Sequence, residues 1–218
     1  LDDARNLDVF ARAGFLPTAW EGPPDSGMAA FGELILEAKS EAYERAIRAV
    51  EGDRCRRLLL GAARWIEAGE WTTSQEPLFK LPREMRVSRL ARAALSRRLK
   101  AVRKRGSALD ADDPPARHRL RIRVKKLRYS AEFFAALYPK KAAKPYLAAL
   151  SDLQDALGGL NDIAVGRDIA SSLIRQAPAP AVFAAGQVAG MQAAREKALL
   201  KSARKAYAGQ MDAEPFWD

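Results

Sequence analysis

The residues best suited to chemistry in this sequence are cations that recur at one helical turn between Arg117 and Glu132. This stretch is dense in Lys and Arg, holds the only histidine of the protein, and contains no Gly or Pro. At about 100° per residue, one set of its side chains falls within a sector of roughly 80° on a helix. We call this set the cation row; it consists of His118, Arg121, Lys125 and Arg128. A cation every ~5 to 6 Å predicts a face that binds a linear polyanion.

Apolar residues border the cation row on both sides of the helical projection. One border consists of Leu120, Val124, Leu127, Ala131 and Phe134, and the other of Ile122, Tyr129 and Phe133. A fully solvated face needs no such borders, so we interpret the row as a binding face. Arg119, Arg123 and Lys126 lie on the far side, and we interpret them as solvent-facing charge. Glu132 follows Arg128 at i, i+4 and is expected to orient its guanidinium.

Two other segments repeat this arrangement. A helix expected from Pro82 to Arg105 carries a second row, which consists of Arg86, Arg89, Arg97, Lys100 and Lys104. A last helix, expected over residues 182–207, carries a third row of Lys197, Lys201 and Arg204. Two basic helices side by side would form a trough for a linear polyanion, so we expect these rows to support the first.

The positive charge is concentrated in one part of the chain. The net charge is +10, but residues 81–141 hold 19 Lys or Arg and 5 Asp or Glu, a balance of 19 − 5 = +14. The rest of the chain holds 18 basic and 22 acidic residues, a balance of −4. Such segregation indicates a polyanionic partner: nucleic acid, an anionic membrane surface or a phosphate polymer.

Several kinds of catalytic and metal site are excluded by the residue types. One His, one Cys at position 55 and no carboxylates at ligand spacing leave no zinc or iron site, and there is no GxxxxGKS phosphate loop. We therefore expect no cofactor, no metal and no enzymatic activity. His118 is interpreted as a hydrogen-bonding anchor or an extra cation, which predicts binding that tightens modestly as the pH falls towards 6.

The residues favour a phosphate polymer over nucleic acid. The basic segments contain few aromatics to stack on bases, and no helix-turn-helix, zinc-finger or RNP pattern occurs. Nucleic acid stays the first alternative, and an accessory role beside a phosphoanhydride hydrolase is the second. No apolar run approaches the ~18 residues that cross a bilayer, so we expect a soluble, cytoplasmic protein without a membrane partner.

Helical periodicity and breakers divide the whole chain into helices, which predicts an all-α fold. The expected helices cover residues 1–14, 28–50, 53–68, 82–105, 114–137, 144–174 and 182–207. Asp53 and Asp113 are the expected N-caps of the third and fifth, the latter followed by Pro114 and Pro115. Gly158 and Gly159 interrupt the long sixth helix, which favours a close contact with another helix.

A short internal repeat suggests a duplicated fold. LDDARNLDV (1–9) aligns with LGGLNDIAV (157–165), and the polar pair Arg5-Asn6 matches Asn161-Asp162. If the fold is duplicated, the counterpart of the helix that carries the cation row should precede Leu1. We therefore expect the first of two similar bundles to lack its N-terminal helices.

These motifs together resemble a known family. HRLRIRVKKLRYSAEFF resembles HxxRxxxKKLRYxxE, the signature of the CHAD family of conserved-histidine α-helical domains. LQDALGGLNDIAV resembles that family's second motif, DARNLDV its counterpart in the first half, and the terminal PFW its closing motif. The match adds Lys126 to the expected binding residues, and gives Tyr129, Glu132, Asn161 and Asp162 structural or orienting roles.

The resemblance implies both a fold and a ligand. The implied fold is two helical bundles of long antiparallel helices related by a pseudo-two-fold axis, with residues 1–80 and 81–218 as the two halves of one domain. The implied ligand is inorganic polyphosphate, bound by basic helix faces without established catalysis, and an association with polyphosphate granules is compatible with that role. In some relatives the domain is fused to a triphosphatase domain, of which this sequence shows nothing.

Overall fold

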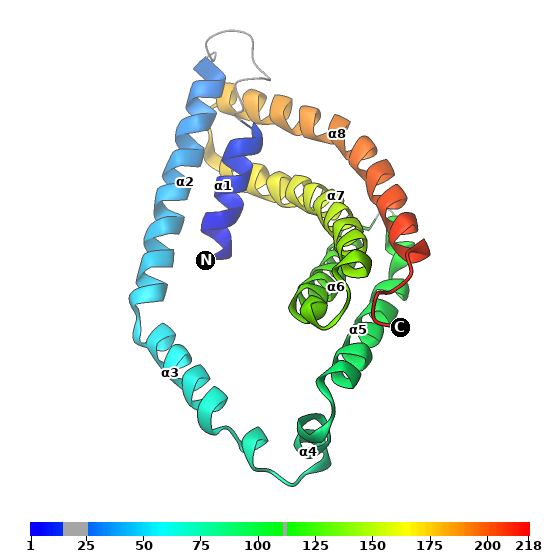
Figure 1. Ribbon diagram of the computed structural model, residues 1–218. Helices are drawn as coiled ribbons and strands as arrows, with labels where there is room; N and C mark the ends of the chain where they lie inside the picture. Colours follow the sequence, from blue (N-terminus) through cyan, green and yellow to red (C-terminus); the bar gives the residue numbers. More distant parts are fainter. Residues whose placement is uncertain (15–25, 111–112) are drawn as a thin grey trace. The chain divides into compact units, whose positions relative to one another are not determined.

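The computed structural model describes residues 1–14, 26–110 and 113–218, and these residues form helices without any strand (Figure 1). The helices are α1 (Asp2–Gly14), α2 (Ser26–Glu51), α3 (Asp53–Ala68), α4 (Pro77–Glu84), α5 (Val87–Arg103), α6 (Pro114–Phe134), α7 (Lys140–Leu173) and α8 (Ala179–Asp212). Short 3₁₀ turns lie at Glu70–Thr72, Gly106–Leu109, Ala135–Leu137 and Ile174–Gln176. The all-α prediction is confirmed. The loop predicted between residues 14 and 27 lies largely outside the described residues.

The chain divides into two compact units. The first contains Leu1–Arg83 and Val165–Gln192, and the second contains Glu84–Ala164 and Ala193–Asp218. The long helices α7 and α8 therefore contribute to both units. The sequence placed all of 81–218 in one half, whereas residues 165–192 group with the first unit. The pseudo-two-fold relation between the halves stays a prediction.

The second unit is a four-helix bundle around one apolar core. The buried side chains that α5, α6, α7 and α8 contribute to it include Leu95, Leu99, Leu120, Val124, Leu127, Leu150, Leu153, Leu157 and Ala203. Burying each large aliphatic side chain contributes about 1.5–3 kcal/mol, so this core carries most of the unit's stability. The PFW ending joins the same core through Phe216 and Trp217.

Specific hydrogen bonds hold the C-terminal tryptophan in the second unit. The Trp217 indole Nε1 donates to Ser96 Oγ at 3.0 Å, and Arg92 Nε donates to the Trp217 carbonyl at 2.8 Å. The Tyr146 ring packs edge to face on Phe216 and Trp217, with centroids 5.6 and 5.0 Å away. The closing motif is therefore a packing element of the α5–α7 contact.

The start of α6 is where the sequence predicted it, but the α-helix ends at Phe134, three residues before the predicted end. The Asp113 side chain accepts a hydrogen bond from the Ala116 backbone N–H at 2.9 Å, which caps the helix at its prolines. At the other end, α6 passes through a 3₁₀ turn to Tyr138, which is extended as the residue before a proline prefers to be.

The predicted N-cap of α3 was wrong. Gly52 occupies the cap position, and no side chain caps the helix there. Asp53 is the first helical residue and pairs with Arg56 at 3.4 Å. A carboxylate in the first turn still interacts favourably with the helix dipole, which explains why the sequence signal resembles that of a cap.

The single helix predicted from Pro82 to Arg105 was also wrong. Pro82 lies inside α4, which ends at Glu84, and α5 begins at Val87 with Arg86 as its N-cap residue. A proline inside a helix leaves the carbonyl four residues earlier without a donor, which favours an early end. At the other long helices the differences are smaller: α7 begins four residues earlier than predicted, and α8 extends to Asp212.

One of the two central glycines of α7 matches the expected close contact. A Cβ on Gly159 would lie 3.1 Å from the methyl groups of Leu199 on α8, whereas a Cβ on Gly158 would meet nothing within 4 Å. The packing explanation therefore holds for Gly159 alone.

The first unit buries less of its apolar surface. Its main core joins Phe10 of α1 and Phe31 of α2 to alanines of α7 and α8. On its polar side, Asp8 pairs with Lys39 at 2.7 Å and accepts a hydrogen bond from Tyr43. By contrast, α3 and α4 contain no buried residue, and the exposed apolar side chains of α3 include Leu58, Leu59, Leu60, Trp65 and Ile66.

Candidate anion-binding face of α6

The buried side of α6 fixes the direction in which the cation row points. Leu120, Val124 and Leu127 are fully buried in the core of the second unit. In a helix, the residues of the cation row lie roughly 70° to 150° around the axis from these leucines and valine. Arg121 and Arg128 therefore lie at the margin of the buried face and are half-buried, whereas His118 and Lys125 point further towards solvent and are exposed.

His118 is held by a side chain of α7. Its Nδ1 lies 2.6 Å from Asn161 Oδ1, and both residues belong to the second unit. An amide oxygen can only accept, so Nδ1 carries the proton and donates. The other ring nitrogen, Nε2, is an acceptor in the neutral ring and becomes a donor when the ring is protonated. Asp162, the other half of the polar pair, is half-buried on the same helix.

Arg128 is oriented by the glutamate one turn later. Its Nε donates to Glu132 Oε1 at 2.8 Å, which is the i, i+4 pair that the sequence predicted. The Glu132 hydrogen bond, assisted by the carboxylate of Asp155 on α7, raises the pKa of Arg128 above its ordinary value. The bond engages Nε, so a ligand would meet the two terminal nitrogens of the guanidinium.

The two cations between His118 and Arg128 differ in exposure. Arg121 is half-buried, and its buried Nε makes no hydrogen bond with the described residues. Lys125 is exposed, and its Nζ lies 5.5 Å from the centre of the Tyr129 ring. Arg121 thus offers a partly desolvated guanidinium, whereas Lys125 offers a mobile charge above an aromatic ring.

The far side of α6 is exposed, as predicted. Arg119, Arg123 and Lys126 all face solvent, and Arg119 pairs at 3.6 Å with the capping residue Asp113. Lys126, which the family signature added to the binding residues, therefore lies across the helix from the cation row.

The predicted apolar border beyond the cation row was wrong on one side. Ile122 is half-buried, but Tyr129 is 53% exposed and Phe133 is 79% exposed. A helical projection shows which residues share a face, but it does not show whether another element covers them. We call Tyr129 and Phe133 the aromatic edge; it lies in solvent beside the cation row.

The second row, on α5, is exposed, and no hydrogen bond or ion pair of the described residues links it to the cation row on α6. Within α5, Arg89, Arg97 and Lys100 face solvent opposite the buried Leu95 and Leu99. Arg86 and Lys104 are also exposed, but they occupy the cap positions at the two ends of α5.

The α6 row borders α7 through His118 and Asn161. Among the described residues, no hydrogen bond or ion pair joins the α5 row to the α6 row. The predicted trough between these two helices therefore stays a prediction.

The residues of the third row, on α8, differ in their contacts. Lys197 and Lys201 are exposed. Arg204 donates from Nε to the Leu109 carbonyl at 3.0 Å and lies 3.7 Å from the Asp110 carboxylate. Arg204 thus fastens the 3₁₀ turn between α5 and α6, a role that its sequence position did not reveal.

Sequence reasoning missed a buried ion pair at the start of the basic stretch. Arg117 is only 7% exposed, and its Nη2 lies 3.1 Å from Glu196 Oε1 on α8. The available signal was its spacing, because position 117 precedes the buried Leu120 by three residues and so shares its face. The pair fixes α6 against α8 within the second unit.

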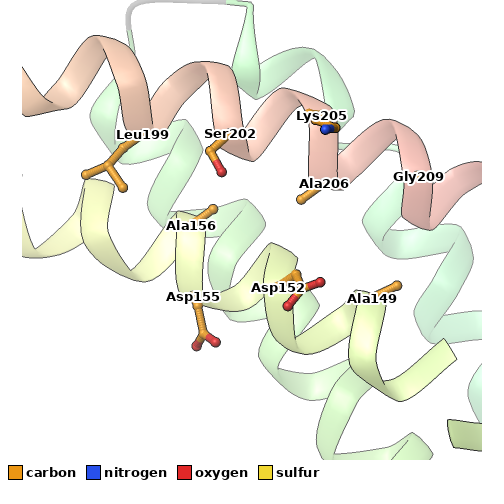
Figure 2. Close-up of a pocket in the computed structure, with 9 residues that line it drawn as sticks. All are labelled: Ala149, Asp152, Asp155, Ala156, Leu199, Ser202, Lys205, Ala206 and Gly209. Carbon is orange, nitrogen blue, oxygen red and sulfur yellow. The ribbon is translucent and has the colours of Figure 1, made fainter. Parts of the chain in front are cut away.

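A groove lies between α7 and α8 in the second unit. It has a volume of about 670 Å³ and is lined by Ala149, Asp152, Asp155, Ala156, Leu199, Ser202, Lys205, Ala206 and Gly209 (Figure 2). Figure 2 shows Asp155 pointing away from α8. Two carboxylates and one lysine disfavour an anion here, so the groove does not compete with the cation row as a phosphate site.

Two features of the described residues bear on the chemistry. Within residues 1–14, 26–110 and 113–218, no three His, Cys, Asp or Glu side chains are grouped to hold a metal ion. In the same part of the chain, each helix is too short or too polar to cross a membrane.

Comparison with known proteins identifies the family. No curated protein matches the chain. The family model described as the CHAD domain matches residues 1–171, which is most of the 218-residue chain and includes α1, α6 and the Asn161-Asp162 pair. This protein therefore belongs to the CHAD domain family.

Proposed function

We propose that the chain binds inorganic polyphosphate along the cation row of α6 and acts as a non-catalytic binding module. The main support for the proposal is the anchoring of the side chains of the cation row. Asn161 anchors one end and Glu132 the other, while Arg121 and Lys125 between them form no ion pair with a described residue. A row that is anchored at both ends and carries two cations without an ion-pair partner between them suits a ligand that brings its own negative charge.

Membership of the CHAD family supports polyphosphate as that ligand. Arg121, Lys125 and Arg128 are the primary residues, and His118 adds charge when protonated. Supporting contacts would come from other exposed cations of the second unit, namely Lys126, Arg86, Arg89, Arg97, Lys100, Lys104, Lys197 and Lys201. Arg204 is left out of the primary set because its Nε is engaged by Leu109 and Asp110. A cytoplasmic location, with recruitment to polyphosphate granules, would follow from this activity.

A charge-reversal experiment tests the proposal. Arg121→Glu/Lys125→Glu/Arg128→Glu is expected to weaken binding of long-chain polyphosphate at least about tenfold, because each charged hydrogen bond contributes roughly 1.5–3 kcal/mol. The matched control, Arg54→Glu/Arg56→Glu/Arg57→Glu, changes the net charge equally on exposed residues of α3 and should have a much smaller effect. Binding should also weaken steeply as salt rises. Equal losses in the two variants, or no dependence on salt, would contradict the proposal.

The non-catalytic part of the proposal needs its own measurement. Incubation of the protein with polyphosphate and divalent cations should release no phosphate above the rate without protein. Phosphate release that disappears in the His118→Ala variant would instead indicate a catalytic histidine.

A further inference from the structure

The aromatic edge of α6 is not explained by polyphosphate. Phe133 is 79% exposed and Tyr129 is 53% exposed, and they lie one helical turn apart. The Phe133 ring meets Phe134 edge to face, with centroids 4.9 Å apart and planes at 83°. The apolar face of α6 is already buried in the core, so these two rings are additional to what the bundle needs. A polymer of phosphate alone carries no flat group that would use them.

The position of the edge beside the cation row fits a polyanion that carries flat groups. Residues at i and i+4 on a helix lie about 5–6 Å apart, so the two rings are neighbours on the surface of α6. Proteins that bind single strands stack successive bases on aromatic side chains beside a basic groove. Lys125 lies on the same side of α6 as Tyr129, with its Nζ 5.5 Å from the ring centre, so phosphate and base contacts would be adjacent. Aromatic rings accept any base by stacking, without a hydrogen-bond code.

We infer that single-stranded nucleic acid binds along α6, with its phosphates on the cation row and its bases stacked on Tyr129 and Phe133. Both the inference and the proposed polyphosphate function use the cation row. The inference rests on the proposed function for its phosphate contacts. It differs in requiring the aromatic edge. The chain would then bind single strands and polyphosphate in competition.

Two other occupants fit the edge less well. A helix that binds a membrane surface presents a broad apolar face to the lipid. On α6 that face is buried as Leu120, Val124 and Leu127. Double-stranded nucleic acid hides its bases in the stack and would meet only the cations. The exposed rings therefore favour a strand whose bases are free.

The test compares two strands that differ only in their bases. Binding of the full chain is measured to oligo(dT) about 20 nucleotides long and to an abasic oligonucleotide of the same length, at one fixed salt concentration. The oligo(dT) is expected to bind about tenfold or more tightly, because each stacked base contributes roughly 1–3 kcal/mol. Tyr129→Ala/Phe133→Ala should remove that advantage. Phe133→Ala alone, which keeps the contact between Lys125 and the Tyr129 ring, should reduce the advantage and leave polyphosphate binding within about twofold of the parent.

A matched variant controls for the loss of exposed aromatic surface elsewhere. Trp65→Ala/Phe183→Ala removes two rings that are 61% and 67% exposed on α3 and α8. It should leave oligo(dT) binding unchanged. Because Tyr129 and Phe133 are exposed, their variant is expected to keep the helical circular dichroism spectrum of the parent, which separates lost binding from lost folding.

The outcomes separate this inference from the proposed function. Equal binding of oligo(dT) and the abasic strand overturns the inference, whereas polyphosphate binding that depends on Arg121, Lys125 and Arg128 still supports the function. Loss of the oligo(dT) advantage in the aromatic variant supports the inference even if polyphosphate fails to bind. If the variant instead loses binding to phosphatidylserine vesicles and keeps oligo(dT) binding, the edge serves a membrane and the inference is wrong.

Discussion

His118 is the residue of the candidate site whose local chemistry is most completely determined. Its Nδ1 is committed to Asn161 Oδ1 at 2.6 Å, so the neutral ring carries its proton on Nδ1 and presents Nε2 as the variable nitrogen. The sequence identified both residues but did not join them, because they are 43 positions apart on different helices. Only the packing of α6 against α7 brings them into contact.

The tautomer of this ring is directly testable. His118 is the only histidine in the chain, so its ring nitrogens can be observed by nitrogen NMR without ambiguity. The parent protein is expected to show the Nδ1–H tautomer at a pH where the ring is neutral. Asn161→Leu removes the acceptor and should produce a mixture of tautomers, whereas Asn161→Asp retains an acceptor and should preserve the parent pattern. An unchanged spectrum in Asn161→Leu would show that Asn161 does not orient the ring.

The segments that form helices were predictable from periodicity, but the residues at which the helices begin and end were not always predictable. The start of α6 was correct because Asp113, Pro114 and Pro115 each restrict the backbone locally. The α4–α5 break was missed because Pro82 resembles a helix start when it is read without its neighbours. The burial of faces was less predictable still: Tyr129 and Phe133 have the composition of a buried border, yet both side chains are exposed.

The two aspartates at helix starts provide a matched test of capping. Asp113→Ala is expected to destabilise the second unit by about 1 kcal/mol, because the Ala116 N–H loses its acceptor. Asp53→Ala removes an exposed first-turn charge and its exposed ion pair with Arg56, and should cost less than about 0.5 kcal/mol. Denaturant unfolding of both variants measures the difference. Equal losses of unfolding free energy in the two variants would mean that the hydrogen bond of Asp113 adds nothing to the effect of its charge.

The whole chain is organised by two helices that serve both units. The sequence predicted long helices at α7 and α8 but divided the chain once, near residue 80, because a continuous helix carries no local mark of a unit boundary. The division actually passes through both of them, at Val165 and at Ala193. The cation row, its Asn161 anchor and the Arg117–Glu196 pair nevertheless all belong to the second unit.

The core of that unit also predicts how the protein responds to alkaline pH. Tyr146 is only 2% exposed and packs against Phe216 and Trp217, and burial raises the pKa of its phenol to about 12. In the unfolded chain the phenol ionises near its ordinary value of 10. Above pH 10 the unfolded state therefore loses a proton that the folded state retains, and stability falls until the pH reaches about 12.

The expected loss is on the order of 2 kcal/mol across this range, because one pKa unit corresponds to about 1.4 kcal/mol. Tyr146→Phe keeps the ring and its aromatic contacts but cannot ionise. Its free energy of unfolding, measured by urea denaturation between pH 9 and 12, should decline less than that of the parent. Tyr207, whose pKa is raised mainly by burial, would still contribute a smaller decline in both proteins. Parallel pH profiles for parent and variant would show that the Tyr146 hydroxyl is as accessible to solvent in the folded protein as in the unfolded chain.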